Sequence, residues 1–255
     1  MISGTGNELF LLLLFFTSTL IAQYLQKKGL KIKIRDIPAL LAINEAVRRC
    51  AEMNKPIIVA VGIGDQSKPE TMAGLALVEH VSKQCAKLDI ELITTSTQSV
   101  IITALEGIIS EAYTTAGKAE LYTPGKYTRY FGNAQFAYVA GLSGIMQRER
   151  PGACLYMGSI WDEMLMLPEV GNAVGAMQIG GSINVDTCGI LIATCDYALF
   201  TEEIYATAAE LGDNQVLKAS MLGQDVGKIF IMGMSILGFI LALFGNNIIY
   251  SLLEW

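Results

Sequence analysis

The sequence has little charge, and the charge it has avoids both ends of the chain. Only 16% of the residues are Asp, Glu, Lys or Arg, against roughly 25% in an ordinary soluble domain. Residues 9–25 and 229–253 contain no charged side chain. Residues 26–228 hold all 18 Lys and Arg but 22 acidic residues, so this stretch is mildly acidic. With no basic, aromatic-rich patch, it does not fit a nucleic-acid partner.

Metal-binding and catalytic signatures are also missing. The chain has a single histidine, His80, and no C-x-x-C pair. Its five cysteines lie at irregular spacing, mostly inside apolar runs: Cys50, Cys85, Cys154, Cys188 and Cys195. This pattern is typical of reduced thiols that pack as small hydrophobic groups. We expect no metal site and no resident cofactor, and the sequence identifies no catalytic residue and favours a protein that is not an enzyme.

The two uncharged stretches predict membrane-spanning helices, since a span needs about 20 mostly apolar residues. Residues 9–25 (LFLLLLFFTSTLIAQYL) favour an anchor over a cleaved signal peptide, because the tail before them has an acid, Glu8, and no base. Residues 229–253 form the clearer second span. We therefore expect a tail and transmembrane helix over 1–25, an α/β domain over 26–228 and a second transmembrane helix over 229–255.

The positions of Lys and Arg predict the orientation of these spans. A basic cluster, including Lys27, Lys28 and Arg35, follows the first span, and Lys218 and Lys228 precede the second. The outer tails contain no Lys or Arg. By the positive-inside rule the protein is a two-pass protein of the cell membrane, with both termini outside and the central domain in the cytoplasm. Reduced cysteines fit that compartment.

Helical and strand-like runs alternate through the middle of the chain. Apolar, β-branched runs ended by glycine, such as PIIVAVGIG, are typical of strands buried on both faces. We expect helices over 39–53, 69–88, 99–115, 133–147, 161–167 and 202–211, and strands over 56–64, 90–97, 153–160, 176–183 and 188–195. This alternation predicts a Rossmann-like α/β fold, a mainly parallel sheet with covering helices. The Tyr-rich stretch 119–132 is the longest irregular segment, and we interpret it as a flap or contact loop.

Ligands of open α/β sheets bind beyond the carboxyl ends of the strands. The first candidate there is the turn from Gly62 to Ser67, in which Gly62 and Gly64 permit close backbone approach and Asp65 can hold a hydroxyl or a metal. It is not a dinucleotide fingerprint, because the third glycine is missing and Lys68-Pro69 delays the helix. The alternative is a tight turn capped by Asp65 or Ser67.

Two further strand ends carry suitable groups. In the stretch 94–99, the hydroxyls of Thr95, Ser96 and Thr97 lead into a helix start, which can hold an anion through free N–H groups or can simply be capped. After the apolar run 188–195, Asp196 precedes Glu202 and Glu203. These carboxylates can bind Mg²⁺ or act as acid and base, or the glutamates can form an acidic first helical turn.

Several motifs occur together in one order. They are PIIVAVGIGD, AGLALVEHV, GNAQFAYVAGLSGIMQRERPGACLYMG, GAMQIGG, ATCDYALFTEEIYA and LGQDVGK, followed by a terminal hydrophobic helix. In these motifs the sequence resembles a prokaryotic family of membrane-anchored proteins of unknown function, over most of residues 37–243. The resemblance implies the anchored α/β architecture and brings no activity.

The sequence favours a non-catalytic scaffold or assembly subunit that associates with copies of itself through its cytoplasmic domain. Aromatic rings and arginine are enriched at interface hot spots. We expect the interface in the Tyr-rich stretch, at Tyr122, Tyr127, Arg129 and Tyr130. Small residues let membrane helices approach closely, so Gly238 and Ala242 are expected to face another helix.

Two alternatives remain open. One is a membrane-bound enzyme or sensor that binds a small anionic ligand at residues 62–65 and 94–99. The other is an accessory subunit of a larger membrane complex with other membrane subunits as partners. In each case the lipid bilayer is an expected partner.

Overall fold

The computed structural model describes residues 5–28, 37–161, 165–212 and 215–243. The chain divides into two compact units. One is Arg35–Asp213, and the other combines Met1–Ile34 with Asn214–Trp255. The sequence predicted the boundaries of the middle domain at 26 and 228. The larger unit is shorter because a helix continues to Lys27 and the last helix begins at Gln215.

The described residues of the larger unit form a six-stranded sheet in the order β3-β2-β1-β4-β5-β6. Every neighbouring pair is parallel. The strands are β1 (Ile57–Gly62), β2 (Leu92–Ser96), β3 (Thr128–Tyr130), β4 (Ala153–Ser159), β5 (Met177–Ser182) and β6 (Tyr197–Phe200). The predicted α/β fold with a parallel sheet is therefore confirmed.

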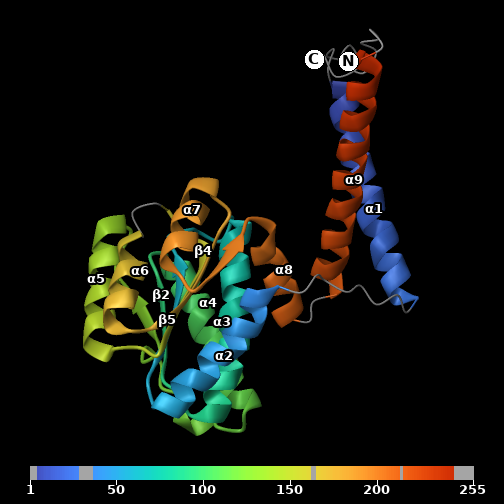
Figure 1. Cartoon of the computed structure of the whole chain (residues 1–255). Coiled ribbons are helices and arrows are strands. Elements are labelled where there is room, and N and C mark those ends of the chain that lie inside the picture. Colours follow the sequence, from blue (N-terminus) through green and yellow to red (C-terminus); the bar gives the residue numbers. More distant parts are fainter. Residues whose placement is uncertain (1–4, 29–36, 162–164, 213–214, 244–255) are drawn as a thin grey trace. The chain divides into compact units, whose positions relative to one another are not determined.

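Helices cover both faces of this sheet (Figure 1). The helices α2, α3, α4 and α8 lie on one face, where α3 packs against the other three, and α5, α6 and α7 lie on the opposite face. Their bounds are α2 Pro38–Met53, α3 Pro69–Leu88, α4 Ser99–Thr115, α5 Gln135–Glu149, α6 Met166–Val174, α7 Val185–Thr194 and α8 Glu202–Leu211, with a short 3₁₀ helix η1 at Ala119–Leu121. Because both faces are covered, every residue of β1, β2, β4 and β5 is buried.

Two expected elements were wrong. The apolar run 188–195 lies in helix α7 and is not a strand, and the strand follows it as β6. A short apolar run fits a strand and a buried helix equally well. Here the helix is favoured by its N-cap, because Asn184 Oδ1 accepts the N–H of Asp186. The helix expected over 161–167 begins later, as α6, and part of that expected range lies outside the described residues.

The Tyr-rich stretch is not wholly irregular. Its residues Thr128–Tyr130 form β3, which pairs with β2 at the edge of the sheet. The stretch also begins with η1. A three-residue strand with one exposed side gives too short a pattern to recognise from sequence. The segment is therefore part of the sheet.

The cysteines pack as predicted. Cys50, Cys85, Cys154 and Cys188 are buried and all five cysteines are free thiols. Burial raises the pKa of Cys50, Cys154 and Cys195 to about 12. These thiols are neutral and serve as small apolar side chains.

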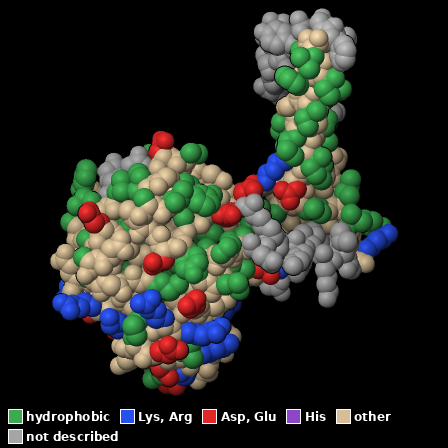
Figure 2. All heavy atoms as spheres, viewed as in Figure 1, with side chains coloured by type: hydrophobic (Ala, Val, Ile, Leu, Met, Phe, Trp, Pro, Cys, Tyr) green, Lys and Arg blue, Asp and Glu red, His purple; other side chains and the backbone are tan. Residues whose placement is uncertain are grey.

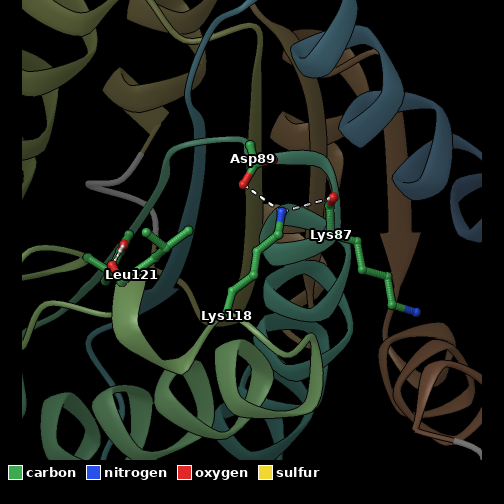
Figure 3. A network of polar contacts seen from close by, with 5 residues as sticks. Lys87, Asp89, Lys118 and Leu121 are labelled. Carbon is green, nitrogen blue, oxygen red and sulfur yellow. Dashed lines mark hydrogen bonds and ion pairs between the residues drawn. The ribbon is translucent and has the colours of Figure 1, made fainter.

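At the amino edge of the sheet, Lys118 links the chain after α4 to the end of α3 (Figure 3). Its Nζ lies 2.6 Å from Asp89 Oδ1 and donates to the carbonyl oxygen of Lys87 at 3.4 Å. Asp89 has a left-handed conformation and ends α3, so Lys118 caps that helix end with a positive charge. This contact fixes the chain after α4 at the edge opposite to the one where ligands are expected.

The smaller unit consists of α1 (Thr5–Lys27) and α9 (Gln215–Leu243), which pack against each other. A side chain on Gly223 would overlap Thr19, and one on Gly227 would overlap Phe15. The hydroxyl of Ser18 donates to the carbonyl oxygen of Gly223 at 3.3 Å. The two glycines, four residues apart, let the helices approach closely.

One helix among the described residues is long and apolar enough to cross a membrane, Val216–Leu243. It starts well before the predicted boundary at 229. The apolar part of α1, Leu11–Leu25, is shorter, so the N-terminal span stays a prediction. Gly238 is half-buried and Ala242 is exposed, and their contact with another helix also stays a prediction.

We predict that Gly158→Ala destabilises the protein. Gly158 has φ +149°, and a Cβ there would overlap the carbonyl oxygen of Val61. Backbone strain alone should lower the free energy of unfolding by about 1–3 kcal/mol. The matched control is Gly107→Ala in α4, where a Cβ would have no atom within 4 Å. The free energy of unfolding of this variant should rise by about 0.5–1 kcal/mol. Urea unfolding followed by circular dichroism measures both, and equal effects would contradict the prediction.

Candidate functional site

The order of the strands reverses between β1 and β4. The chain leaves β1 toward β2 and β3 on one side, and it leaves β4 toward β5 and β6 on the other. The helices α3 and α4, which connect β1, β2 and β3, lie on one face of the sheet (Figure 1). The helices α6 and α7, which connect β4, β5 and β6, lie on the opposite face. This is the arrangement of doubly wound sheets, whose ligands bind outside the carboxyl ends of the strands at the reversal.

The backbones of β1 and β4 meet closely at this point. Gly62 has φ +86°, and a Cβ there would overlap the carbonyl oxygen of Ser159. The N–H of Ile63 donates to the same oxygen at 3.0 Å. The register between the strands shifts after Ala60, which marks a bulge that redirects the chain. Gly62 is therefore required by the close approach of β1 to β4, and its role in binding a ligand stays a prediction.

Residues 63–68 form the β1–α3 loop, and Asp65 stabilises its turn. Asp65 Oδ1 accepts the N–H of Ser67 at 2.9 Å and its hydroxyl at 2.5 Å. These two hydrogen bonds hold the pKa of the exposed Asp65 carboxyl below its ordinary value. The geometry thus matches the alternative in which Asp65 caps a tight turn, and Ser67 is its partner.

Gly64 lies directly against two hydroxyl-bearing side chains. A Cβ on Gly64 would overlap Thr71 Oγ1 and Ser159 Cβ. Thr71 is in the first turn of α3 and is fully buried, and its hydroxyl has no hydrogen-bond partner among the described residues. A buried hydroxyl without a partner costs about 1–3 kcal/mol. This unsatisfied hydroxyl lies directly beneath the glycine loop.

The end of β2 lies at the same edge, since Ser96 pairs with Gly62. Thr97 Oγ1 donates to the carbonyl oxygen of Ile63 at 3.2 Å. The hydroxyl of Thr95 lies 2.7 Å from that of Tyr138, which is fully buried in α5. The structure therefore brings the first two candidate strand ends together, and the hydroxyl of Thr97 holds the start of the β1–α3 loop.

The third candidate cluster does not form. Asp196 comes before β6, at the amino edge of the sheet, because the apolar run before it is a helix. Its Oδ2 accepts the N–H of Gln178 at 2.8 Å. Glu203 lies beyond the other end of β6, where its Oε2 accepts the N–H of Phe200 at 3.0 Å. The expected grouping of Asp196 with these glutamates was wrong.

Positive charge is scarce at the carboxyl edge. The connections that leave the six strands there contain one basic residue, Lys68. In Figure 2 most of the Lys and Arg side chains visible on this unit lie toward its lower end, which is the opposite edge. Within the described ranges no group of three or more His, Cys, Asp and Glu side chains is arranged to hold a metal. A ligand here would be held chiefly by hydroxyls and backbone N–H groups.

Two exposed aromatic rings flank this edge. Trp161, two residues after Ser159, is 51% exposed, and Tyr130, at the end of β3, is also 51% exposed. Sequence reasoning missed Trp161 as a site residue because it placed the residue inside a helix. Its position after an apolar strand was the available signal.

The Tyr-rich segment packs on α4 through Glu106. This carboxylate accepts hydrogen bonds from the hydroxyls of Tyr122 and Thr128 and from the N–H of Gly125. Tyr127 is buried against the ring of Tyr122, with centroids 5.9 Å apart. The segment is therefore clamped to its own domain.

Of the four predicted interface residues, Tyr130 presents the most exposed ring. Arg129 is half-buried and donates from Nη1 to the carbonyl oxygens of Lys126 at 2.7 Å and Thr128 at 2.8 Å. Tyr127 is 3% exposed. The role of these residues at an interface stays a prediction.

Comparison with known proteins gives a family without an activity. A family model described as a domain of unknown function, DUF6754, matches residues 3–253. No curated protein and no solved structure matches the chain. The match covers both units, and its description assigns no reaction, ligand or partner.

We predict that Glu106→Gln loosens the Tyr-rich segment. Burial acts to raise the pKa of Glu106, but hydrogen bonds from Thr128, Tyr122 and Gly125 outweigh it and hold the pKa below its ordinary value. The clamp is therefore complete above the unfolded pKa and is lost as the pH falls through the folded one. At neutral pH the variant's amides over 122–130 should exchange with deuterium faster than the wild type's. Glu111→Gln, exposed on the same helix, is the control, and equal exchange in all three proteins would contradict the clamp.

Proposed function

Because the chain belongs to the DUF6754 family of unknown function, we propose its function from its own geometry: a membrane-anchored protein whose α/β domain binds a small anionic ligand at the β1–α3 loop. The observation that carries the proposal is the buried, unpartnered hydroxyl of Thr71 against Gly64 at the strand reversal. In the sequence this was an alternative to a scaffold. The approach of Gly62 and Gly64 to the same residue, Ser159, at the strand reversal now favours it.

Backbone N–H groups supply the donors for the anion. Those of Gly64, Asp65 and Gln66 donate no hydrogen bond within the described part of the chain. They lie in the loop ahead of Lys68, the N-cap of α3, a helix of 20 residues whose amino end carries partial positive charge. Successive backbone N–H groups in a turn can form an anion-binding concavity. The Thr71 hydroxyl, in the first turn of the same helix, adds a side-chain donor.

The charge of the ligand must be small. Lys68 is the single basic residue in the connections at this edge, and the ionised Asp65 opposes an anion. Doubly charged phosphate groups are usually bound by Arg, Lys or a metal ion. The site therefore suits anionic groups with one negative charge each, such as a diester phosphate or a carboxylate.

Attachment to the lipid bilayer is supported by α9. The helix Val216–Leu243 has a mean hydropathy of 2.2 in its most apolar part, and its large side chains are mostly exposed, including Ile229, Phe239 and Leu243. Exposed apolar side chains on a long helix favour a lipid environment. The helix α9 supports one of the two expected spans, and the bias of Lys and Arg in the sequence supports the two-pass topology with the ligand site in the cytoplasm.

We predict that Thr71→Val stabilises the ligand-free protein and weakens ligand binding. Valine has the shape of threonine without the hydroxyl, so the free energy of unfolding should rise by about 1 kcal/mol. Affinity for ADP-ribose, a probe with one charge on each phosphate, should fall about fivefold or more. Thermal unfolding and thermophoresis in lipid nanodiscs measure the two effects.

The matched control is Thr207→Val. Thr207 in α8 is also fully buried with no hydrogen-bond partner for its hydroxyl among the described residues. It lies outside the β1–α3 loop, so its replacement should raise stability and leave the affinity unchanged. Unchanged ADP-ribose affinity in Thr71→Val would count against the proposed site.

Self-association is a second proposal, and helix α7 favours it. Val185 and Ile192 on this helix are 74% and 55% exposed, and α7 lies beside the edge strand β6. Exposed apolar patches on a domain mark interaction sites. A second copy of the chain is the default occupant of such a face, and it would bring ligand sites into proximity at the membrane.

We predict that Ile192→Asp reduces the oligomer to smaller species, because a carboxylate in an apolar contact is costly to desolvate. Glu111→Gln serves as the surface control. Mass photometry in nanodiscs measures particle mass. A wild-type particle with the mass of one chain would refute self-association, and a particle with other chains would indicate the accessory-subunit alternative.

A further inference from the structure

We infer that the ligand of the β1–α3 loop carries a planar heterocyclic ring, and that Trp161 stacks on this ring. The inference rests on the proposed function and names the class of ligand, a nucleotide-like compound whose phosphate groups are diesters. Three observations carry it: the position of Trp161, its exposure, and the types of side chain that surround the loop.

Trp161 lies near Gly64 because it closely follows Ser159 in the chain. Ser159 Cβ lies directly against Gly64, since a Cβ on that glycine would overlap it. Trp161 follows two residues later, and two residues of extended chain span at most about 7 Å. The backbone of Trp161 therefore lies at the same strand end as the β1–α3 loop.

The exposure of Trp161 is unusual for its type. Tryptophan is large and highly buried on average, whereas Trp161 is 51% exposed. The strand before it is buried at every residue, and Ile160 is 6% exposed. The chain thus places an apolar, π-rich surface in solvent immediately beyond a buried strand end. A flat ring is the group that covers such a surface with the largest contact.

The groups that follow β2 are engaged within the protein and do not form a ribose site. In sheets that bind dinucleotides, an acidic residue holds the ribose hydroxyls, but β2 is followed here by Thr97 and Gln98. Thr97 Oγ1 and Gln98 Nε2 both donate to the carbonyl oxygen of Ile63. Recognition therefore depends on the anion and the ring, and the ribose contributes little. Base–aromatic stacking improves affinity by about 5- to 150-fold.

The intrinsic fluorescence of the protein tests this directly. The chain has two tryptophans, so Trp255→Phe in the full-length protein in detergent leaves Trp161 as the single reporter. ADP-ribose and P1,P2-dimethyl diphosphate are titrated; the second has the same singly charged phosphates and no ring. ADP-ribose should quench Trp161 and bind about tenfold or more tighter than dimethyl diphosphate.

Two leucine variants separate the aromatic rings. Trp161→Leu should lower ADP-ribose affinity to that of dimethyl diphosphate and leave dimethyl diphosphate binding unchanged, as measured by calorimetry. Tyr130→Leu removes a ring with the same exposed fraction, 51%, and should leave both affinities unchanged. Thermal unfolding of each variant confirms that it folds.

The outcomes are distinct. If neither compound binds the wild type, the proposed function fails and the ring inference fails with it. If dimethyl diphosphate binds and ADP-ribose binds no tighter, the ring inference alone is overturned. If Tyr130→Leu weakens ADP-ribose binding and Trp161→Leu does not, the ring lies over β3 and the assignment to Trp161 is overturned.

Discussion

The backbones of β1 and β4 approach each other so closely at their carboxyl ends that neither Gly62 nor Gly158 has room for a side chain. This contact fixes where the chain leaves the sheet. It sets the direction of the β1–α3 loop, and the loop then passes over Thr71 and Ser159 at Gly64. A parallel sheet with its strand reversal at this point leaves the strand ends uncovered there. The candidate site therefore follows from one backbone constraint.

A second group of residues holds the loop in this position. Tyr138 crosses from α5 to reach the hydroxyl of Thr95, and Thr97 and Gln98 both donate to the carbonyl oxygen of Ile63. Thr97 and Gln98 belong to the connection after β2, and Tyr138 belongs to the opposite layer of helices. A site supported by such contacts is rigid before a ligand arrives, which reduces the entropic cost of binding. Among the described residues two fully buried hydroxyls lack a partner, those of Thr71 and Thr207, and the one at Thr71 lies beside the strand reversal. An unsatisfied buried group at such a position is a candidate for function.

Much of the fold was predictable because its local signals agree. The bounds of α3, α4 and α8 match the predicted ranges, and the signals there are strong: Pro69 in the first turn of α3, and Glu202 and Glu203 in that of α8. The strand β1 was clear from its β-branched run and glycine end. The errors fell where one pattern fits two structures, as in α7, whose continuous apolar sequence reads equally as a buried strand. That error also displaced Asp196 to the wrong edge of the sheet.

The site could be predicted only in part. Glycine spacing located Gly62 and Gly64, but the state of Thr71 depends on which groups tertiary packing brings within hydrogen-bond reach, and no local pattern carries that information. The central claim is that ligand binds at the strand reversal. Hydrogen–deuterium exchange of the full chain in nanodiscs with and without ADP-ribose tests it most directly. Ligand binding at this place should slow amide exchange at residues 62–71 and 159–161 alone. Unchanged exchange at these residues, or slower exchange only around residues 183–200, would contradict the claim.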